Sequence, residues 1–90
     1  MISRQRLWQL RNELPIDRVL EALDVETKER DGYLRFLCPL CRDFNTAVNP
    51  RTNLARCFRC ERNFNTIDLA LVVKKQEFRD VVAWLSKLLV

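Results

Sequence analysis

Apolar residues in the first quarter of the chain recur at the spacing of two amphipathic helices. A short helix is expected over residues 4–13, with its apolar positions on one face: Leu7, Leu10 and Leu14. Ser3 can cap that helix, and Pro15 ends it, because proline lacks a backbone donor and suits the first turn of a following helix. A second helix is expected over residues 16–23, where apolar residues follow the i, i+3, i+4, i+7 pattern: Ile16, Val19, Leu20 and Leu23.

The middle of the chain changes to the alternation typical of strands. Two alternating runs, residues 25–30 and 33–37, flank Asp31-Gly32 and predict a hairpin, since Asp-Gly favours a tight two-residue turn. Gly32 is the only glycine in the chain, which agrees with a turn at this place. Two further short strands are expected, joined by a turn rich in asparagine: residues 47–49 and 54–58.

The last third of the chain returns to helical spacing. Residues 65–74 are expected to be helical, with Asn65 as the N-cap and Asp68 completing a capping box. The clearest helix is expected over residues 76–90, where apolar residues form one stripe: Phe78, Val81, Val82, Leu85 and Leu88. The whole pattern predicts a small α+β fold, in which an antiparallel sheet of three or four strands is flanked by N-terminal and C-terminal helices.

Length and composition limit the classes of protein to which the chain can belong. Its 90 residues are 48% hydrophobic and 31% charged, which is typical of one small globular domain. It contains no run of roughly 20 apolar residues, the length of a membrane span. Its first residues lack the pattern of a signal peptide. We therefore expect a cytoplasmic protein that does not bind membranes and whose cysteines stay reduced.

The four cysteines carry the chemistry that the sequence predicts. They form two C-x2-C pairs separated by fifteen residues: Cys38, Cys41, Cys57 and Cys60. Two such turns that face each other make a tetrahedral S4 cage, so the spacing predicts one structural Zn²⁺ ion and a zinc ribbon. The chain contains no histidine, so a mixed Cys/His site is excluded. Because four thiolates complete the coordination of zinc, no position is left for a substrate.

Other uses of these cysteines compete with zinc. Disulfides are disfavoured in a reducing compartment, and a C-x2-C redox pair normally occurs alone at the start of a helix. Iron is the sharper rival, because an S4 cage also holds iron and residues 38–41 are similar to a rubredoxin knuckle. Such knuckles usually place glycine after the second cysteine, whereas this chain has Arg42 and Glu61 there. These two residues favour zinc.

The order of residues around the cysteines resembles the zinc-binding domain of bacterial-type DNA primases, over residues 16–88. That family has a strand leading into Cys-Pro-x-His or Cys-Pro-x-Cys, then Cys-Phe-x-Cys, then a helix reading roughly Asn/Asp-x-Ile-x-Phe. This chain matches the three motifs in order: residues 37–41, 57–60 and 65–69. It departs from the family at Cys41, where most members have histidine, and at the glycines near the second knuckle, which are replaced: Arg59, Glu61 and Phe64.

The resemblance implies a recognition module that binds single-stranded DNA during replication priming. Its expected partners are a primase catalytic domain or a replication helicase, and no small-molecule substrate is expected. The chain alone is not expected to be an enzyme, because its aspartates are scattered and it has no Gly-rich phosphate loop. It would be the non-catalytic domain or accessory of a primase. The alternatives are a zinc-ribbon protein-docking module without DNA binding and a rubredoxin-like iron electron carrier.

We interpret residues 1–90 as a single domain in three parts. Residues 1–14 are an N-terminal helical extension, residues 15–64 are the helix plus zinc ribbon, and residues 65–90 are the C-terminal helices. Trp8 lies in the extension but off its leucine stripe, so it either covers the edge of the core or marks a contact surface. The arginines around it are typical of a solvated helix face: Arg4, Arg6 and Arg11.

Charge placement indicates where DNA would bind. The formal charge is +4, and four thiolates with one Zn²⁺ would lower it to about +2. Twelve of the sixteen basic residues are arginine, whose planar fork suits phosphate. Strand alternation predicts that Tyr33, Arg35 and Arg56 lie on the open face of the sheet. We hypothesise a nucleic-acid-binding platform of these residues with one from the turn: Tyr33, Arg35, Arg51 and Arg56.

Two other sets of residues have competing roles. Three phenylalanines are expected in the core rather than as stacking groups: Phe36, Phe58 and Phe78. Three arginines flank the knuckles and either offset the negative charge of the metal cage or contact DNA: Arg42, Arg59 and Arg62.

Overall fold

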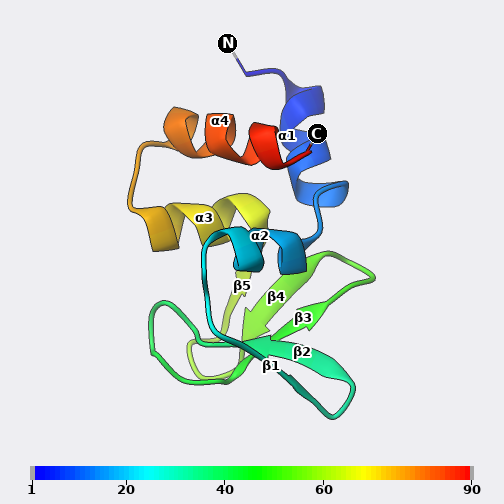
Figure 1. The fold of residues 1–90 in the computed structure, drawn as a ribbon, viewed down its shortest axis with the longest axis vertical. Helices are drawn as coiled ribbons and strands as arrows, with labels where there is room; N and C mark the ends of the chain where they lie inside the picture. The colour runs from blue at the N-terminus through cyan, green and yellow to red at the C-terminus, as the bar shows by residue number, and fades with distance from the viewer. Residues whose placement is uncertain (1, 90) are drawn as a thin grey trace.

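The computed structural model describes residues 2–89, which form a small α+β fold with helices at both ends of the described chain, before and after the strands (Figure 1). The elements follow one another as α1 (Arg4–Asn12), α2 (Ile16–Ala22), β1 (Thr27–Arg30), β2 (Tyr33–Phe36), β3 (Thr46–Asn49), β4 (Leu54–Cys57), β5 (Arg62–Phe64), α3 (Thr66–Lys74) and α4 (Phe78–Leu89). The predicted fold class is confirmed. The expected last helix extended to Val90, which lies outside the described residues. No helix in the described part is both long enough and apolar enough to cross a membrane.

The five strands pair in sequence order, each antiparallel to the next. The predicted hairpin is confirmed, because Arg30 faces Tyr33 across a two-residue turn. Both turn residues have positive φ, 55° at Asp31 and 81° at Gly32, which is the geometry of a type I′ turn. The sequence did not predict β5, which is only three residues long and pairs with β4 across the turn that holds Cys60.

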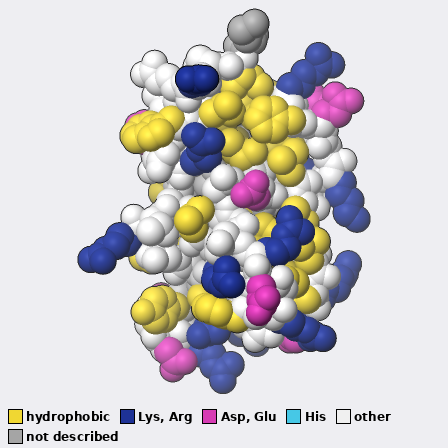
Figure 2. All heavy atoms as spheres, turned by 180° about the vertical axis from the view of Figure 1, so that it is seen from behind, with side chains coloured by type: hydrophobic (Ala, Val, Ile, Leu, Met, Phe, Trp, Pro, Cys, Tyr) yellow, Lys and Arg dark blue, Asp and Glu magenta, His cyan; other side chains and the backbone are white. Residues whose placement is uncertain are grey.

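Helices cover one face of the sheet and leave the other open (Figure 1). In that view α2 and α3 lie next to the sheet, and α1 and α4 lie beyond them. Seen from behind, hydrophobic side chains gather over the helical half of the molecule (Figure 2). Alternation sends every second strand residue toward the helices, so the core combines sheet and helical residues: Phe36, Val48, Ala55 and Phe64 with Leu10, Leu14, Ile16, Val19, Leu20, Leu69, Val81 and Leu85.

Side-chain caps fix the starts of two helices, as predicted. The Ser3 hydroxyl accepts a hydrogen bond from the Arg6 N–H at 3.1 Å and caps α1. At α3, the Asn65 side chain accepts from the Asp68 N–H at 2.8 Å, and the Asp68 carboxylate accepts from the Asn65 N–H at 3.1 Å. This reciprocal capping box satisfies two backbone donors that the helix leaves unpaired. It also fixes the point where the chain leaves β5 for the helical layer.

Asn53 joins the turn between β3 and β4 to the helical layer. Its Oδ1 accepts from the Ile16 N–H at 3.0 Å, and its Nδ2 donates to the carbonyls of Arg11 and Leu14, both at 2.8 Å. These partners lie at the junction of α1 and α2, where helix ends leave backbone groups without partners. One side chain thus fixes the end of α1 against the sheet.

The phenylalanines divide between core and surface. Phe36 is fully buried, as expected, but Phe58 is 60% exposed and Phe78 is 45% exposed. The core prediction is therefore wrong for the last two. Phe58 continues the outward alternation of Leu54 and Arg56 from β4, and Phe78 begins α4 in its exposed first turn.

Candidate metal centre and open sheet face

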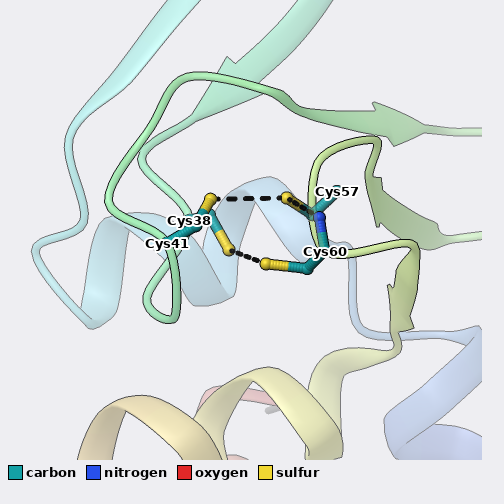
Figure 3. Close-up of side chains that lie close together, drawn as sticks. All are labelled: Cys38, Cys41, Cys57 and Cys60. Carbon is teal, nitrogen blue, oxygen red and sulfur yellow. Dashed lines mark hydrogen bonds between the residues drawn. The ribbon is translucent and has the colours of Figure 1, made fainter.

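Four cysteine side chains meet at one end of the sheet (Figure 3). Cys38 and Cys41 lie in the loop between β2 and β3, whereas Cys57 ends β4 and Cys60 lies in the turn to β5. Cys38 and Cys57 are buried and the other two are half-buried. The structure therefore brings the four predicted metal ligands together from two separate segments.

The sulfur positions fit a tetrahedral metal site. Cys38 Sγ lies 3.9 Å from Cys60 Sγ, and Cys41 Sγ lies 3.6 Å from Cys57 Sγ. All four sulfur atoms lie within 4.8 Å of one another. A regular tetrahedron with metal–sulfur bonds of about 2.3 Å has sulfur–sulfur edges of about 3.8 Å. The four cysteines are free thiols, so every sulfur is available as a ligand.

The two knuckles share a sharp backbone turn. The residue after the second cysteine of each pair is left-handed, with φ of 59° at Arg42 and 56° at Glu61. Glycine adopts this conformation most easily, so two larger residues hold a strained backbone here. In the first knuckle, the Arg42 N–H donates to the Cys38 carbonyl at 2.9 Å and closes the turn. Each knuckle thus directs two sulfur atoms toward one centre.

The surroundings of the sulfur atoms separate their acidities. Burial raises the pKa of Cys57, but the Cys60 N–H and the Thr46 hydroxyl donate toward its sulfur and help to bring the pKa down to about 6. Burial and the neighbouring sulfur atoms raise the pKa of Cys60 to about 12. Burial also raises the pKa of Cys41. A metal cation would counter both increases, because it favours the thiolate form of each ligand.

Thr46 supports the centre from the neighbouring strand. It is fully buried and lies directly opposite Cys57 in the register of β3 and β4. Its Oγ1 makes no hydrogen bond of ordinary geometry with the described residues, although the hydroxyl lies close enough to the Cys57 sulfur to lower the pKa of that thiol. The Cys57 sulfur is the acceptor that faces this hydroxyl, and a thiolate accepts hydrogen bonds more strongly than a neutral thiol. Metal binding would therefore satisfy a buried polar atom.

Charged side chains close the outer rim of the centre. The Arg59 guanidinium donates to the Asp43 carboxylate at 2.7 Å, which joins the two knuckles. The Lys28 ammonium lies 4.4 Å from the centroid of the Phe44 ring, so β1 also contacts the first loop. Two of the three arginines that flank the knuckles contact protein groups. Arg59 binds Asp43, and the Arg62 guanidinium lies 5.6 Å from the centroid of the Phe64 ring.

The arrangement can hold a metal ion but gives that ion no open position. Four thiolates complete a tetrahedral shell, which leaves no place for water or substrate. Zinc and iron both accept such an S4 site. Chemically, the centre is a clamp that ties the β2–β3 loop to the β4–β5 turn.

The open face of the sheet carries a hollow beside the metal centre. Strand register places side chains in rows across this face, and the central row is Lys28, Arg35, Ala47, Arg56 and Asn63. The structure brings the four residues of the hypothesised platform together as lining of the hollow: Tyr33, Arg35, Arg51 and Arg56. Their role in binding DNA stays a prediction.

The hollow has further residues that sequence reasoning missed. Phe58 lines it, and Tyr33 is similarly exposed at 54%. Tyr33 begins β2 beside the hairpin, whereas Phe58 follows β4 beside the cysteines, so the two rings mark opposite ends of the hollow. The remaining lining residues are polar or apolar: Asn49, Thr52, Asn63, Ala47, Val48, Leu54 and Ala55. The alternation of Leu54, Arg56 and Phe58 was the available signal for an outward Phe58.

None of the described residues that line the hollow is acidic. Arg56 Nη1 donates to Asn63 Oδ1 at 3.3 Å, so its partner is neutral. Arg35 is half-buried, and its Nε has no partner among the described residues. Because no carboxylate neutralises these guanidinium groups, the hollow is positively charged and suited to an anion.

A scan against protein-family models finds no match to this chain, and a search of curated proteins also finds none. The resemblance to primases therefore rests on the order of residues around the cysteines.

Proposed function

We propose that this chain is a zinc-dependent module that binds single-stranded DNA, like the template-recognition domain of the primases that it resembles. The observation that carries the proposal is the hollow on the open sheet face. It combines three arginines and two exposed aromatic rings with no acidic lining residue. Proteins that bind single strands use such a combination, a basic groove for the phosphates and aromatic faces for the bases.

The aromatic rings favour a single strand over a duplex. Tyr33 and Phe58 are each more than half exposed, so their faces are accessible to a ligand. Bases in a duplex stack on one another, whereas unpaired bases have faces free to stack on protein rings. Arg35, Arg51 and Arg56 lie between and beside the rings, where they can contact the phosphates that connect the stacked bases.

The proposed metal is one structural zinc ion, held by Cys38, Cys41, Cys57 and Cys60. Zinc is favoured over iron because the knuckle positions that normally carry glycine in iron sites hold Arg42 and Glu61. Elemental analysis of the purified protein should find about one equivalent of zinc. A red protein that contains iron would overturn the choice of metal but leave the DNA proposal to its own test.

Catalysis is assigned to a partner and not to this chain. A closed S4 centre offers zinc no substrate position, and the primase resemblance points to a separate primase catalytic domain or a replication helicase as the partner. Adding the chain to a primase core should increase primer synthesis on a single-stranded template. The double variant Arg35→Ala, Arg56→Ala should abolish that increase. No increase with the wild-type chain would remove the primase core as the partner.

Fluorescence anisotropy with a labelled oligonucleotide tests DNA binding directly. Affinity should fall with salt concentration, and Arg35→Ala and Arg56→Ala should each reduce the logarithmic salt slope by about 0.7, the value of one phosphate contact on a single strand. Arg79→Ala is the matched control, since it removes one positive charge from α4, away from the sheet.

The outcomes separate specific binding from general charge attraction. Single-stranded DNA should bind more tightly than duplex DNA of the same sequence. If Arg35→Ala and Arg56→Ala behave like Arg79→Ala, the hollow is not the binding site. If the wild-type protein binds no oligonucleotide at low salt, the DNA proposal is wrong, and protein docking becomes the hypothesis to test.

A further inference from the structure

Helix α1 presents an aromatic residue between two arginines on its exposed face. Trp8 is 53% exposed, and Arg4 and Arg11 are also exposed. Residues four positions before and three positions after Trp8 are its neighbours on the helix surface, so the three side chains form one stripe. The primase resemblance begins at residue 16, so it assigns no role to this helix.

The stripe is positively charged, and packing of the core does not account for its exposed tryptophan. The sequence of α1 contains three arginines and no acidic residue. Its contribution to the core comes from the other side, where Leu10 is fully buried and Leu7 is half-buried. The second tryptophan of the chain, Trp84, is half-buried with the Lys74 ammonium 4.3 Å from its ring centroid. Among residues 2–89 no cation lies over the Trp8 ring, although a large exposed aromatic ring is unfavourable in water.

The stripe connects with the hollow on the sheet through the turn between β3 and β4. Asn53 in this turn donates to the Arg11 carbonyl at 2.8 Å, which fixes the end of α1 against the turn. Arg51, two residues earlier in the same turn, lines the hollow. Figure 1 shows the turn and the end of α1 on the same side of the molecule. The turn that carries Arg51 therefore lies beside the end of α1 that carries Arg11.

We propose that a bound single strand does not end in the hollow but continues over α1, with a base stacked on Trp8 and phosphates on Arg4 and Arg11. This inference rests on the proposed function, because it extends the same binding site. Phosphodiester is the ligand chemistry that fits, since the stripe pairs cations with an accessible aromatic face and lacks acidic groups. The chain would then bind a longer strand than the sheet alone can cover.

Oligonucleotide length is the variable that tests the extension. Oligothymidylates of about 4 and about 12 nucleotides both lie within the range of site sizes in small single-strand-binding folds, about 4–16 nucleotides. In a Trp84→Phe background, Trp8 is the only tryptophan. The long oligonucleotide should quench its fluorescence and the short one should not. The long oligonucleotide should also bind more tightly to the wild-type chain.

Variants of the stripe should affect the long oligonucleotide only. Trp8→Ala should weaken its binding roughly 5- to 150-fold, the effect of removing one stacked base, and Trp8→Phe should retain most of the affinity. The double variant Arg4→Ala, Arg11→Ala should lower the salt slope for the long oligonucleotide by about 1.4, because two phosphate contacts are lost. The charge-matched control is the double variant Arg79→Ala, Lys87→Ala, which also removes two positive charges, both from α4.

Failure of the extension is distinguishable from failure of the proposed function. If the short oligonucleotide binds but the long one gains nothing and Trp8→Ala has no effect, the extension is wrong and the hollow stands alone. If neither length binds to the wild-type chain, the proposed function itself fails. Binding of an acidic protein partner that Trp8→Ala disrupts, with no quenching by either oligonucleotide, would assign the stripe to protein docking instead.

Discussion

The two faces of the sheet are built from the same short strands and differ in nearly every chemical respect. The covered face packs against the helices and is almost fully buried: Phe36, Thr46, Val48, Ala55, Cys57 and Phe64. The open face carries aromatic, aliphatic, amide and basic side chains at the alternate positions: Tyr33, Leu54, Asn63, Arg35 and Arg56. Period-two alternation along the strands thus separates two roles. The covered face stabilises the fold, and the open face is available to a ligand.

Metal removal is the strongest test of whether the covered face holds the fold without help. A core of this size is small, and zinc binding supplies on the order of 10 kcal/mol or more of folding free energy in zinc-finger peptides. We expect chelation, or Cys57→Ser, to abolish the cooperative thermal transition followed by circular dichroism. Lower pH should also release the metal, because protons compete with it for the thiolates. A metal-free chain that still melts cooperatively would show that the covered face is sufficient.

A matched pair of phenylalanines tests the division between the faces. Phe64→Ala removes a fully buried ring from the covered face and should lower the free energy of unfolding by about 3–5 kcal/mol. Phe58→Ala removes an exposed ring and should change it by less than about 0.5 kcal/mol. Urea denaturation of the metal-loaded variants measures both. For oligonucleotide binding the order should reverse, since folded Phe58→Ala loses a stacking ring; equal losses of stability would contradict the division.

Asn53 tests how the helical layer is fixed to the edge of the open face. Its φ of 56° suits glycine, so Asn53→Gly removes three side-chain hydrogen bonds without adding backbone strain. We expect a loss of about 2–4 kcal/mol in urea denaturation. Asn49→Ala is the control, since it removes one local bond to the Arg51 N–H and should cost about 1 kcal/mol. Similar losses of stability in the two variants would mean that the hydrogen bonds of Asn53 do not hold the helical layer against the sheet.

The parts of the fold that could be predicted from sequence depend on local signals. Asp31-Gly32 allows two successive residues with positive φ, and Asn65 with Asp68 caps a helix within one turn, so each signal lies beside the structure it causes. β5 has no such signal, because its three residues pair with β4 only after the knuckle has turned the chain. The three bonds of Asn53 span 37 to 42 residues, a distance over which sequence patterns give no register.

The candidate site also contains residues that local sequence signals predict and residues that they do not. Cysteine spacing predicted the four candidate metal ligands, which the structure brings together, since C-x2-C turns can point two sulfur atoms at one centre. Alternation placed Tyr33, Arg35 and Arg56 on one face, and the structure brings them together. Phe58 was assigned to the core on residue type, although its strand position pointed outward. The position of the α1 stripe beside the sheet could not be predicted from sequence, because it depends on the bond between Asn53 and Arg11, which are 42 residues apart.

The smallest expected effect concerns the cost of keeping an arginine on the open face. Arg35 has a buried Nε without a partner in the described residues, and it lies directly opposite Lys28 in the strand register. An unsatisfied buried donor and a like-charge cross-strand pair both destabilise the folded state. Arg35→Met keeps an extended side chain and should therefore raise the free energy of unfolding by about 1 kcal/mol while weakening oligonucleotide binding. Arg56→Met, whose guanidinium already has Asn63 as a partner, should weaken binding without this gain in stability. If Arg35→Met instead destabilises the protein in urea denaturation, the Arg35 side chain belongs to the fold, and the separation between the two faces is less complete than the burial pattern suggests.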